Sequence, residues 1–406
     1  MSRSLHVVMF GDQHPATSGG AQVAMRLQMK YLERAGHAVT IVSPRRHGFN
    51  QQHMPGNVCL DVPSVPIPPD WEYSAVWPGR FAERAIDLGI VGRVERDGLP
   101  LPDLVHVQAD YWGAFLGYRF AERARIPVVH TMHNRVDAGV AATAPFPRAV
   151  LAAINLWRRL ELPGSGAGWD GWAHLRGLAA RAAAVTAPSA HFARRLEEHG
   201  VAPHVDVVWN GIDDDLLTKL GGSEPSGALV WVGRMSPEKR LMPFLEAYAE
   251  SGIRLPVEII GSGFQREEAE RFTRERGLRD RVIFRGRMSY ADTLARIAAA
   301  TALVQTSIGF EAQGMTPFEA AQLGTPSVVS DLDIADEMGG GVWRVPAAGS
   351  ERARIAELAH TLRRVERDAA SGSLPEPSGR VQREFLQSSR TAAMLEVYRG
   401  VLRARG

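Results

Sequence analysis

Two carboxylates lie close to a predicted helix start, in the stretch FEAQGMTPFEAAQLGTP at 310–326. Glu311 precedes the helix, and Glu319 falls within it, three residues after Thr316, which can cap the helix. The N–H groups that begin a helix have no partner inside it and favour anions. Predicted strands on both sides place this turn at the carboxyl edge of a sheet, where a nucleotide diphosphate would fit.

Glu319 also has a purely local interpretation. The sequence Thr316-Pro-Phe-Glu319 matches a capping box, in which the glutamate bonds a backbone N–H at the start of its own helix. No local rule requires Glu311, which lies in the preceding loop. We therefore expect Glu311 to bind a ligand, and for Glu319 the capping interpretation stays open.

A second polar segment, GRMSPEKR at 233–240, directly follows a predicted strand and begins a helix at its Ser-Pro pair. Arg234 and Lys239 lie on either side of that start. Two cations there oppose the helix dipole, so helix stability does not explain them, whereas a bound anion would. The alternative is two solvated surface charges. Gly263, in the sequence Gly-Ser-Gly after another strand, would let the backbone approach the same anion.

The whole chain limits the class of protein. A length of 406 residues favours two domains of roughly 200 residues. The formal net charge of +2 gives no reason to expect nucleic acid as a partner. Cys59 is the single cysteine, which excludes an internal disulfide and a cysteine-based zinc cluster. Neither a signal peptide nor an apolar run of membrane-spanning length is evident, so we expect a cytoplasmic protein.

Buried strands alternate with helices along both halves of the chain, which predicts an α/β fold with parallel sheets. In the first half we expect strands at 5–10, 38–42, 104–107, 128–130, 184–187 and 205–209. In the second half we expect them at 229–232, 257–260, 282–284, 303–305 and 327–329. The segment LGGSEPSG at 220–227 is typical of a linker. Two such sheets in tandem would leave a cleft for a ligand between their carboxyl-end faces.

The first half offers fewer candidates for chemistry. Gly19 and Gly20 follow the first strand, where they either let the backbone approach a charged group or merely form the turn. His133 follows the strand at 128–130, at the edge where parallel sheets bind ligands, and is a candidate site residue. His106 lies inside a strand, and we expect it to be a packing residue.

Two segments of the first half could contact an acceptor or a membrane. The stretch at 61–80 holds five prolines and three large aromatic residues, which suit an acceptor cleft, a lipid contact or an extended surface segment. The stretch at 147–162 predicts a basic amphipathic helix carrying Arg148, Arg158 and Arg159. It fits an anionic membrane surface, or an ordinary half-buried surface helix.

Two further patterns carry little weight. The segment at 166–171 matches the dinucleotide fingerprint, but no strand precedes it, so we expect a loop. Asp331 and Asp333 are spaced like an Asp-x-Asp metal site. Because Arg234 and Lys239 already offer positive charge for a diphosphate, we do not expect a metal there.

Taken together, these segments resemble the retaining glycosyltransferases of the two-Rossmann-domain (GT-B) architecture, in the large family 4. The segment at 233–240 is similar to the donor-phosphate motif of that family, and Glu311-x7-Glu319 to its paired-glutamate motif. The resemblance implies an acceptor-side domain at 1–212 and a donor-binding domain at 228–387. It also implies that a last helix, at about 388–406, returns to the first domain.

The resemblance also implies roles for single residues. Arg234 and Lys239 would hold the donor diphosphate, and retention is attributed to same-face attack without a protein nucleophile. The implied catalytic groups are His133, Glu311, Arg234 and Lys239. The implied donor-binding residues are Gly19, Gly20, Gly233, Arg234, Lys239, Gly263, Met288, Glu311, Gly314, Met315, Thr316 and Glu319. No cofactor and no divalent metal is expected.

The acceptor is less constrained. The sequence EAQGMT at 311–316 resembles a variant of the glutamate motif found in bacterial and plant glycolipid-forming members, including diacylglycerol glycosyltransferases. The sequence VPSVPIPP at 62–69 resembles the proline-rich segment in the N-terminal domain of the same members. The sequence after His133 departs from theirs. We therefore expect transfer of a hexose from a UDP- or GDP-sugar to a membrane lipid of the diacylglycerol type, by an enzyme on the inner face of the membrane. The alternatives are a soluble sugar, polyol or natural-product acceptor, and a nucleotide-sugar epimerase.

Overall fold

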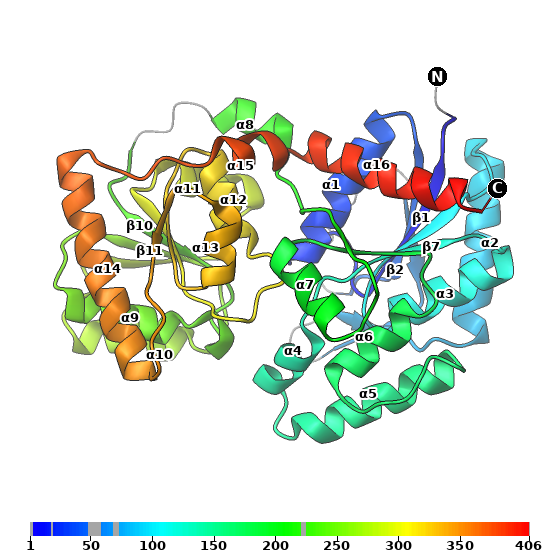
Figure 1. Ribbon diagram of the computed structural model, residues 1–406, viewed down its shortest axis with the longest axis horizontal. Coiled ribbons are helices and arrows are strands. Elements are labelled where there is room, and N and C mark those ends of the chain that lie inside the picture. Colours follow the sequence, from blue (N-terminus) through cyan, green and yellow to red (C-terminus); the bar gives the residue numbers. More distant parts are fainter. Residues whose placement is uncertain (1–2, 18, 48–57, 68–72, 221–224, 406) are drawn as a thin grey trace. The chain divides into compact units, whose positions relative to one another are not determined.

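The computed structural model describes residues 3–17, 19–47, 58–67, 73–220 and 225–405 (Figure 1). The chain divides into two compact units, which we call unit 1 (Met1–Gly211 with Gln387–Gly406) and unit 2 (Ile212–Leu386). Each contains a parallel sheet with helices packed against it. The predicted α/β class with two parallel sheets is confirmed.

The sheet of unit 1 has seven strands in the order β3-β2-β1-β6-β7-β8-β9. They are β1 His6–Gly11, β2 Ala38–Pro44, β3 Cys59–Val62, β6 Leu104–Gln108, β7 Val128–Thr131, β8 Ala184–Ala187 and β9 Asp206–Val207. Strands β4 Val65–Pro66 and β5 Ser74–Ala75 form a separate antiparallel pair. Successive strands are added on one side of β1 and then on the other, so the sheet has its topological switch point between β1 and β6.

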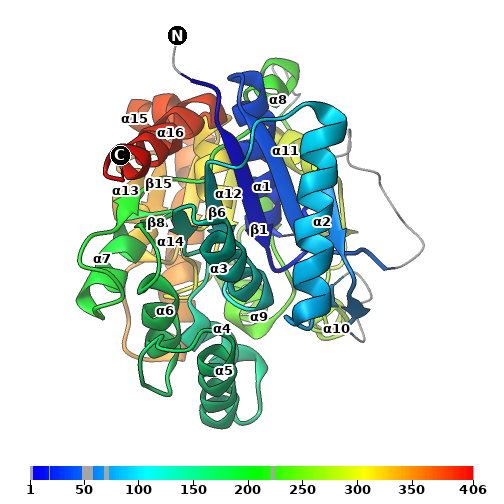
Figure 2. The same ribbon diagram turned by 90° about the vertical axis from the view of Figure 1, so that its right-hand side faces the viewer.

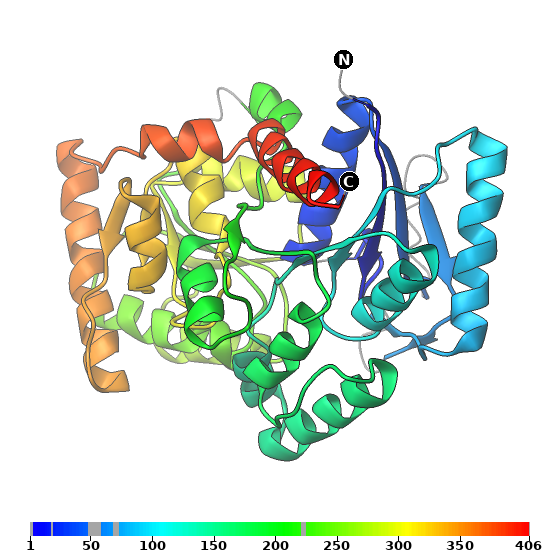
Figure 3. The same cartoon turned by 45° about the vertical axis from the view of Figure 1, so that its right-hand side comes forward.

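The helices of unit 1 are α1 Gly20–Arg34, α2 Arg80–Asp97, α3 Trp112–Ala124, α4 Val136–Thr143, α5 Pro147–Glu161, α6 Gly171–Ala179, α7 Ala190–Glu198 and α16 Gln387–Arg403. Helices α1 and α16 lie side by side (Figures 1 and 3) and share a core with β1 and β2 through Met25, Met29 and Tyr398. Helix α3 covers the opposite face, where Gly117 allows a close approach: a Cβ atom there would lie 2.9 Å from Val107. Helices α4, α5 and α6 gather at one end of the unit (Figure 2).

The sheet of unit 2 has six strands in the order β12-β11-β10-β13-β14-β15, with its switch point between β10 and β13. The strands are β10 Leu229–Val232, β11 Val257–Ile260, β12 Val282–Gly286, β13 Ala302–Gln305, β14 Ser327–Val329 and β15 Val342–Arg344. The helices are α8 Asp214–Leu220, α9 Leu241–Ser251, α10 Arg266–Glu275, α11 Tyr290–Ala299, α12 Met315–Gln322, α13 Leu332–Met338, α14 Glu351–Ser371 and α15 Gly379–Glu384. Helices α9, α10 and α14 share a core with Leu229, Trp231 and Ile259.

The structure departs from the predicted strands in a few places. The strand expected at 205–209 pairs over Asp206–Val207 alone, and neither the edge strands β3 and β15 nor the short pair β4 and β5 were predicted. The segment at 166–170 is a loop, as expected, and the Asp170 side chain caps α6 by accepting a hydrogen bond from the N–H of Ala173 at 2.7 Å. Among the described helices, none has the length and apolar character needed to cross a bilayer.

Candidate functional site

The switch point of unit 2 brings together an ammonium and a carboxylate. Strands β10 and β13 pair directly, so the loops that leave their carboxyl ends lie next to each other. Lys239, in the short 3-10 turn Pro237–Lys239 after β10, places its Nζ 2.5 Å from Oε1 of Glu311, in the loop after β13. The hydroxyl of Ser307 donates a second hydrogen bond to the same oxygen at 2.9 Å. The two predicted site residues are therefore in direct contact.

The surrounding groups fix this pair and set its charge. The Trp231 indole N–H donates to the Thr306 hydroxyl at 2.9 Å, and that hydroxyl donates to the backbone oxygen of Lys239 at 2.7 Å. Burial favours a raised pKa for Glu311, but the Lys239 ammonium, the Ser307 hydrogen bond and Arg234 together outweigh it and hold the pKa of that carboxyl below its ordinary value. Arg234 adds a smaller effect of the same sign, although its own side chain is 61% exposed. Both cations therefore act on one carboxylate.

Gly263 was predicted to let the backbone approach an anion, but the structure gives a different reason for the two glycines after β11. At Gly261 and Gly263, φ is +131° and +158°, and an added Cβ atom would collide with the backbone oxygens of Gly233 and Met235. The N–H of Met235 also donates to the backbone oxygen of Ser262 at 2.9 Å. These glycines therefore let two loops pack together, which holds the 233–240 segment in place.

The predicted capping box is wrong. Helix α12 begins at Met315, because Gly314 adopts a left-handed conformation with φ +71° and is the residue before the helix. A side chain at Gly314 would also come within 2.7 Å of Ile334. Thr316 therefore lies inside the first turn, so Glu319 is too far along the helix to reach its start. The first turn places the N–H groups of Met315 and Thr316 where helices leave them without intrahelical partners.

Glu319 points instead into the interior of unit 2. Its side chain is buried, and the Tyr290 hydroxyl donates to its Oε1 at 2.8 Å. Burial raises the pKa of this carboxyl to about 7, and the Tyr290 hydrogen bond opposes that rise only in part. Met288 lies two residues before Tyr290, half-buried in the loop between β12 and α11. Tyr290 was missed by sequence reasoning, because nothing in its spacing connects it to Glu319.

The candidate residues of unit 1 lie at the carboxyl edge of its own sheet. Gly19 precedes α1 with φ +151°, a conformation that a residue with a side chain rarely adopts, and Gly20 begins the helix. His133 is half-buried in the loop after β7, and its Nε2 lies 3.1 Å from Oε1 of Gln108. Burial lowers the pKa of His133 to about 4, so its imidazole is neutral at pH 7.

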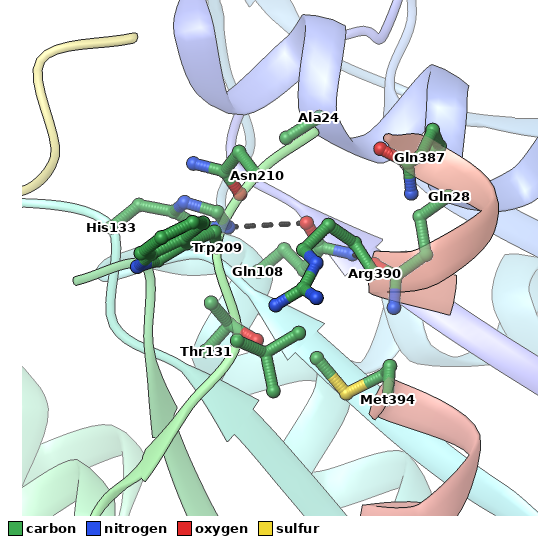
Figure 4. Close-up of a pocket in the computed structure, with 11 residues that line it drawn as sticks. Ala24, Gln28, Gln108, Thr131, His133, Trp209, Asn210, Gln387, Arg390 and Met394 are labelled. Carbon is green, nitrogen blue, oxygen red and sulfur yellow. Dashed lines mark hydrogen bonds between the residues drawn. The ribbon is translucent and has the colours of Figure 1, made fainter. Parts of the chain in front are cut away.

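A polar pocket adjoins His133 within unit 1 (Figure 4). Its empty space is about 300 Å³, counted with the open mouth. It is lined by Ala24, Gln28, Gln108, Thr131, His133, Val208, Trp209, Asn210, Gln387, Arg390 and Met394. Gln387, Arg390 and Met394 come from α16, so the last helix forms one wall. Sequence reasoning predicted none of the pocket residues except His133.

Two aspartates at the switch point of unit 1, the half-buried Asp12 and the buried Asp110, were also missed. Asp12 follows β1 and accepts hydrogen bonds from the N–H groups of Asp110, Tyr111 and Gly113 at 2.6, 3.0 and 2.9 Å. It therefore anchors the start of α3. Asp110 accepts from the Asn134 amide at 2.6 Å, and burial raises its pKa to about 7. Their position directly after β1 and β6 is the one signal by which sequence could have found them.

The Asp-x-Asp pattern has a structural explanation. Asp331 caps α13 by accepting from the N–H of Asp333 at 3.1 Å, and its other oxygen accepts from the N–H of Gly309 at 2.7 Å. Asp331 thus ties α13 to the loop that carries Glu311. Within the part of the chain that the structure describes, no three His, Cys, Asp or Glu side chains gather as metal ligands.

The predicted basic face of α5 is wrong for Arg158. This side chain is fully buried and donates to the hydroxyl of Ser165 at 2.7 Å and to the backbone of the following loop. The exposed side of α5 carries Arg148, as predicted, and also apolar residues: Leu156 is 51% exposed and Leu160 69%, and Phe146 is 74% exposed just before the helix. Arg158 is buried because its guanidinium donates to the backbone oxygens of Ser165 and Gly166 in the loop that follows the helix.

Comparison with known proteins agrees with this geometry. Residues 18–216 match the family described as Glycosyltransferase Family 4, and residues 214–339 match Glycosyl transferases group 1. An alpha-monoglucosyldiacylglycerol synthase of Streptococcus pneumoniae is 24% identical over 362 residues, which are 84% of this chain and 75% of that protein.

Solved structures share the fold. A sucrose-phosphate synthase of Thermosynechococcus elongatus has a TM-score of 0.69 at 17% identity, covering 99% of this chain and 100% of that one. HepE of Anabaena, in complex with UDP-glucose, has a TM-score of 0.64 at 17% identity, covering 97% and 99%.

Proposed function

Since the chain is a glycosyltransferase of the GT-B class with a nucleotide-sugar donor, we propose that it transfers a hexose with retention of configuration to a lipid acceptor. The observation that carries the donor half of the proposal is the contact of Lys239 with Glu311 at the switch point of unit 2. That edge of a doubly wound sheet is where diphosphates bind. The Anabaena structure named above holds UDP-glucose, which favours UDP over GDP as the nucleotide.

The cations would act on the leaving group. As the glycosidic bond breaks, negative charge grows on the diphosphate, and prearranged donors stabilise that charge without reorganising. Lys239 and Arg234 would supply the positive charge, and the N–H groups of Met315 and Thr316 would supply dipoles. Glu311 would accept hydrogen bonds from hydroxyls of the sugar, and Glu319 from the ribose. Such an arrangement needs neither a protein nucleophile nor a metal ion.

Exchange of Lys239 for Ala tests this site. Purified protein is incubated with UDP-glucose, and slow hydrolysis of the donor is measured. Loss of one preorganised charge predicts a fall in kcat of about 100-fold or more. Arg240→Ala is the matched control, because this neighbouring cation pairs with Glu351 at 2.9 Å. Equal rates for the wild type and Lys239→Ala would remove Lys239 from the site, and no hydrolysis of any UDP- or GDP-sugar by the wild type would count against the proposal.

The exposed face of α5 supports a lipid acceptor. Phe146, Leu156 and Leu160 are exposed together with Arg148, while two other polar residues of the helix, Asn155 and Arg158, are buried. Trp169 is 59% exposed beside the helix and stacks on the guanidinium of Arg159 at 4.0 Å. Apolar residues on an outer face with cations at their side suit the boundary between headgroups and acyl chains. The relative from Streptococcus pneumoniae is named for a glycolipid.

Vesicle binding tests the acceptor. We expect the protein to sediment with anionic vesicles, and the double variant Leu156→Glu/Leu160→Glu to bind them at least tenfold more weakly while it still hydrolyses the donor. Leu101→Glu is the control, because Leu101 is 76% exposed in the loop before β6. No binding by the wild type, or equal binding by the double variant, would favour a soluble sugar, polyol or natural product as acceptor.

A further inference from the structure

His133 is the end of a chain of hydrogen bonds between buried side chains that crosses unit 1 to helix α16. The Nε2 of His133 lies 3.1 Å from Oε1 of Gln108, drawn as the dashed line in Figure 4. The amide nitrogen of Gln108 donates to Oε1 of Gln28 at 2.6 Å, and the amide nitrogen of Gln28 donates to the hydroxyl of Tyr398 at 3.1 Å. Gln28, Gln108 and Tyr398 are all buried, at 8, 4 and 0% exposed.

The chain has a direction, because each group has a fixed number of protons. Tyr398 accepts from Gln28, and its hydroxyl lies 2.7 Å from Nδ1 of His106, to which it can donate its own proton. The Gln108 amide nitrogen also lies 3.4 Å from that Nδ1, which leaves its oxygen to face His133. An amide oxygen can only accept. The hydrogen between Gln108 and His133 therefore belongs to Nε2 of His133, and Nδ1 is the acceptor nitrogen of the ring.

We propose that Gln108, Gln28 and Tyr398 are positioning residues for His133, which hold the ring proton on Nε2 and keep Nδ1 as the nitrogen that can accept a hydrogen bond from a hydroxyl of a substrate. This assignment rests on the proposed function. The imidazole of His133 is neutral at pH 7, so its tautomer decides which nitrogen can accept. With the proton on Nδ1 instead, the ring would have no lone pair to offer at that position.

The place of these residues argues for a purpose other than packing. Gln108 and Tyr398 lie on the face of the sheet that carries the apolar core of unit 1, around Leu104, Val129 and Met394. Polar groups in such a place are unfavourable unless every member is bonded, and an apolar set of similar volume would avoid that penalty. The chain also gives the last helix a function: α16 brings Tyr398 back from the far end of the sequence to Gln28, which in turn bonds the Gln108 side chain that contacts His133.

Tyr398→Phe breaks this chain, and Tyr118→Phe is its matched control. The Tyr118 hydroxyl also bonds Nδ1 of a buried histidine, His130, at 2.9 Å, but outside the chain. The measurement is NMR of 15N-histidine-labelled protein, with the His133 signals identified by their loss in His133→Asn. We expect Nε2–H alone in the wild type and in Tyr118→Phe, and a mixture of tautomers in Tyr398→Phe.

Gln108→Glu is a second variant that keeps the volume. It sets a carboxylate against Nε2–H and should raise the pKa of His133 into the range between pH 5 and 8, where the NMR signals would titrate. In donor hydrolysis we expect kcat to fall roughly tenfold to a hundredfold in Tyr398→Phe, because the ring is no longer held in one state, with KM for UDP-glucose unchanged.

The outcomes separate this inference from the proposed function. A wild-type His133 with its proton on Nδ1 would mean that the chain runs in reverse and would overturn the assignment. So would a tautomer that neither Tyr398→Phe nor Gln108→Glu alters. If the wild type hydrolyses no nucleotide sugar, the proposed function fails, while the NMR result still decides whether the three residues hold the ring.

Discussion

Glu311 and Glu319 belong to one motif but lie in opposite electrostatic environments. Glu311 contacts the Lys239 ammonium, which keeps the carboxyl ionised. Glu319 instead accepts a hydrogen bond from the neutral Tyr290 hydroxyl, and burial raises its pKa to about 7. Near neutral pH, one glutamate of the pair is therefore charged and the other is partly protonated. Two residues of the same type can thus play different roles eight positions apart.

The raised pKa of Glu319 predicts a pH-dependent stability of unit 2. Between the ordinary pKa of 4.5 and about 7, the folded protein binds more protons than the unfolded chain, so this group makes the free energy of unfolding fall as the pH rises. The loss between pH 5 and pH 8 is roughly 2–3 kcal/mol. Glu319→Gln removes this contribution. Urea unfolding of both proteins at pH 5, 6, 7 and 8 measures the difference, in which the other titrating groups cancel.

Glu311→Gln is the control for that experiment. Because the pKa of Glu311 is lowered, its carboxyl is ionised in the folded and the unfolded protein throughout this pH range, and the variant should shift stability by a constant amount. A difference between the wild type and Glu319→Gln that stays constant from pH 5 to 8 would show that Glu319 is not buried as described.

At the scale of elements, the 233–240 segment of unit 2 is held in place by a neighbouring loop that contains glycine. The loop after β11 packs on the 233–240 segment because Gly261 has φ +131° and no side chain. We expect Gly261→Ala to lower the free energy of unfolding by roughly 2–5 kcal/mol, as the sum of a left-handed backbone and a collision with Gly233. It should also weaken binding of UDP-glucose, because the collision displaces the loop that carries Lys239. Thermal unfolding with and without the nucleotide sugar measures both effects.

Gly277→Ala separates strain from collision in that test. Gly277 follows α10 with φ +65°, and an added Cβ atom would meet no atom within 4 Å. It should therefore cost about 1–2 kcal/mol and leave binding unchanged. If both variants lose the same stability and bind the donor equally well, the contact between the loops does not support the site.

The position of an element was predictable from the sequence where a local pattern of residues and the parallel order of the strands indicated the same structure. The strands that flank Lys239 and Glu311 are short apolar runs, so their carboxyl ends, and the meeting of the two residues, followed from the parallel order. The start of α12 was not predictable from the Thr-Pro pattern. Gly314, which lies against Ile334 in a left-handed conformation, is the residue before the helix, so α12 begins at Met315 and includes Thr316. The burial of Arg158 was not predicted for a similar reason: its hydrogen bonds to the loop that follows α5, and not helix periodicity, decide where its side chain lies.

At the scale of the whole molecule, histidines divide unevenly between the two units. Unit 2 contains a single histidine, the exposed His360. In unit 1, His14, His106, His130 and His174 are buried, and burial lowers the pKa of each. Their hydrogen bonds serve the neutral ring: His130, for instance, lies between the Tyr118 hydroxyl and the backbone oxygen of Ala109. The two units should therefore respond differently to acid.

Acidification should open unit 1 before unit 2. Below the ordinary histidine pKa of 6.5, the unfolded chain binds protons that these buried rings, and those of His6 and His37, do not bind, so their contribution to stability is lost as the pH falls toward 4. The raised pKa values of Asp12 and Asp110, about 6 and about 7, act in the opposite direction but are fewer. Since the histidines with a lowered pKa outnumber the carboxyl groups with a raised one, the free energy of unfolding of unit 1 should fall between pH 6 and 5.

Unit 2 serves as the internal control, because Glu319 makes it more stable as the pH falls through the same range. Hydrogen exchange followed by mass spectrometry, corrected for the intrinsic exchange rate, reports opening peptide by peptide. Peptides from β6 and β7 should lose protection between pH 7 and 5, while those from β10 and β13 keep it or gain. Equal loss in both sheets, or full protection of β6 and β7 at pH 5, would contradict the idea that neutral, buried histidines set the acid stability of unit 1.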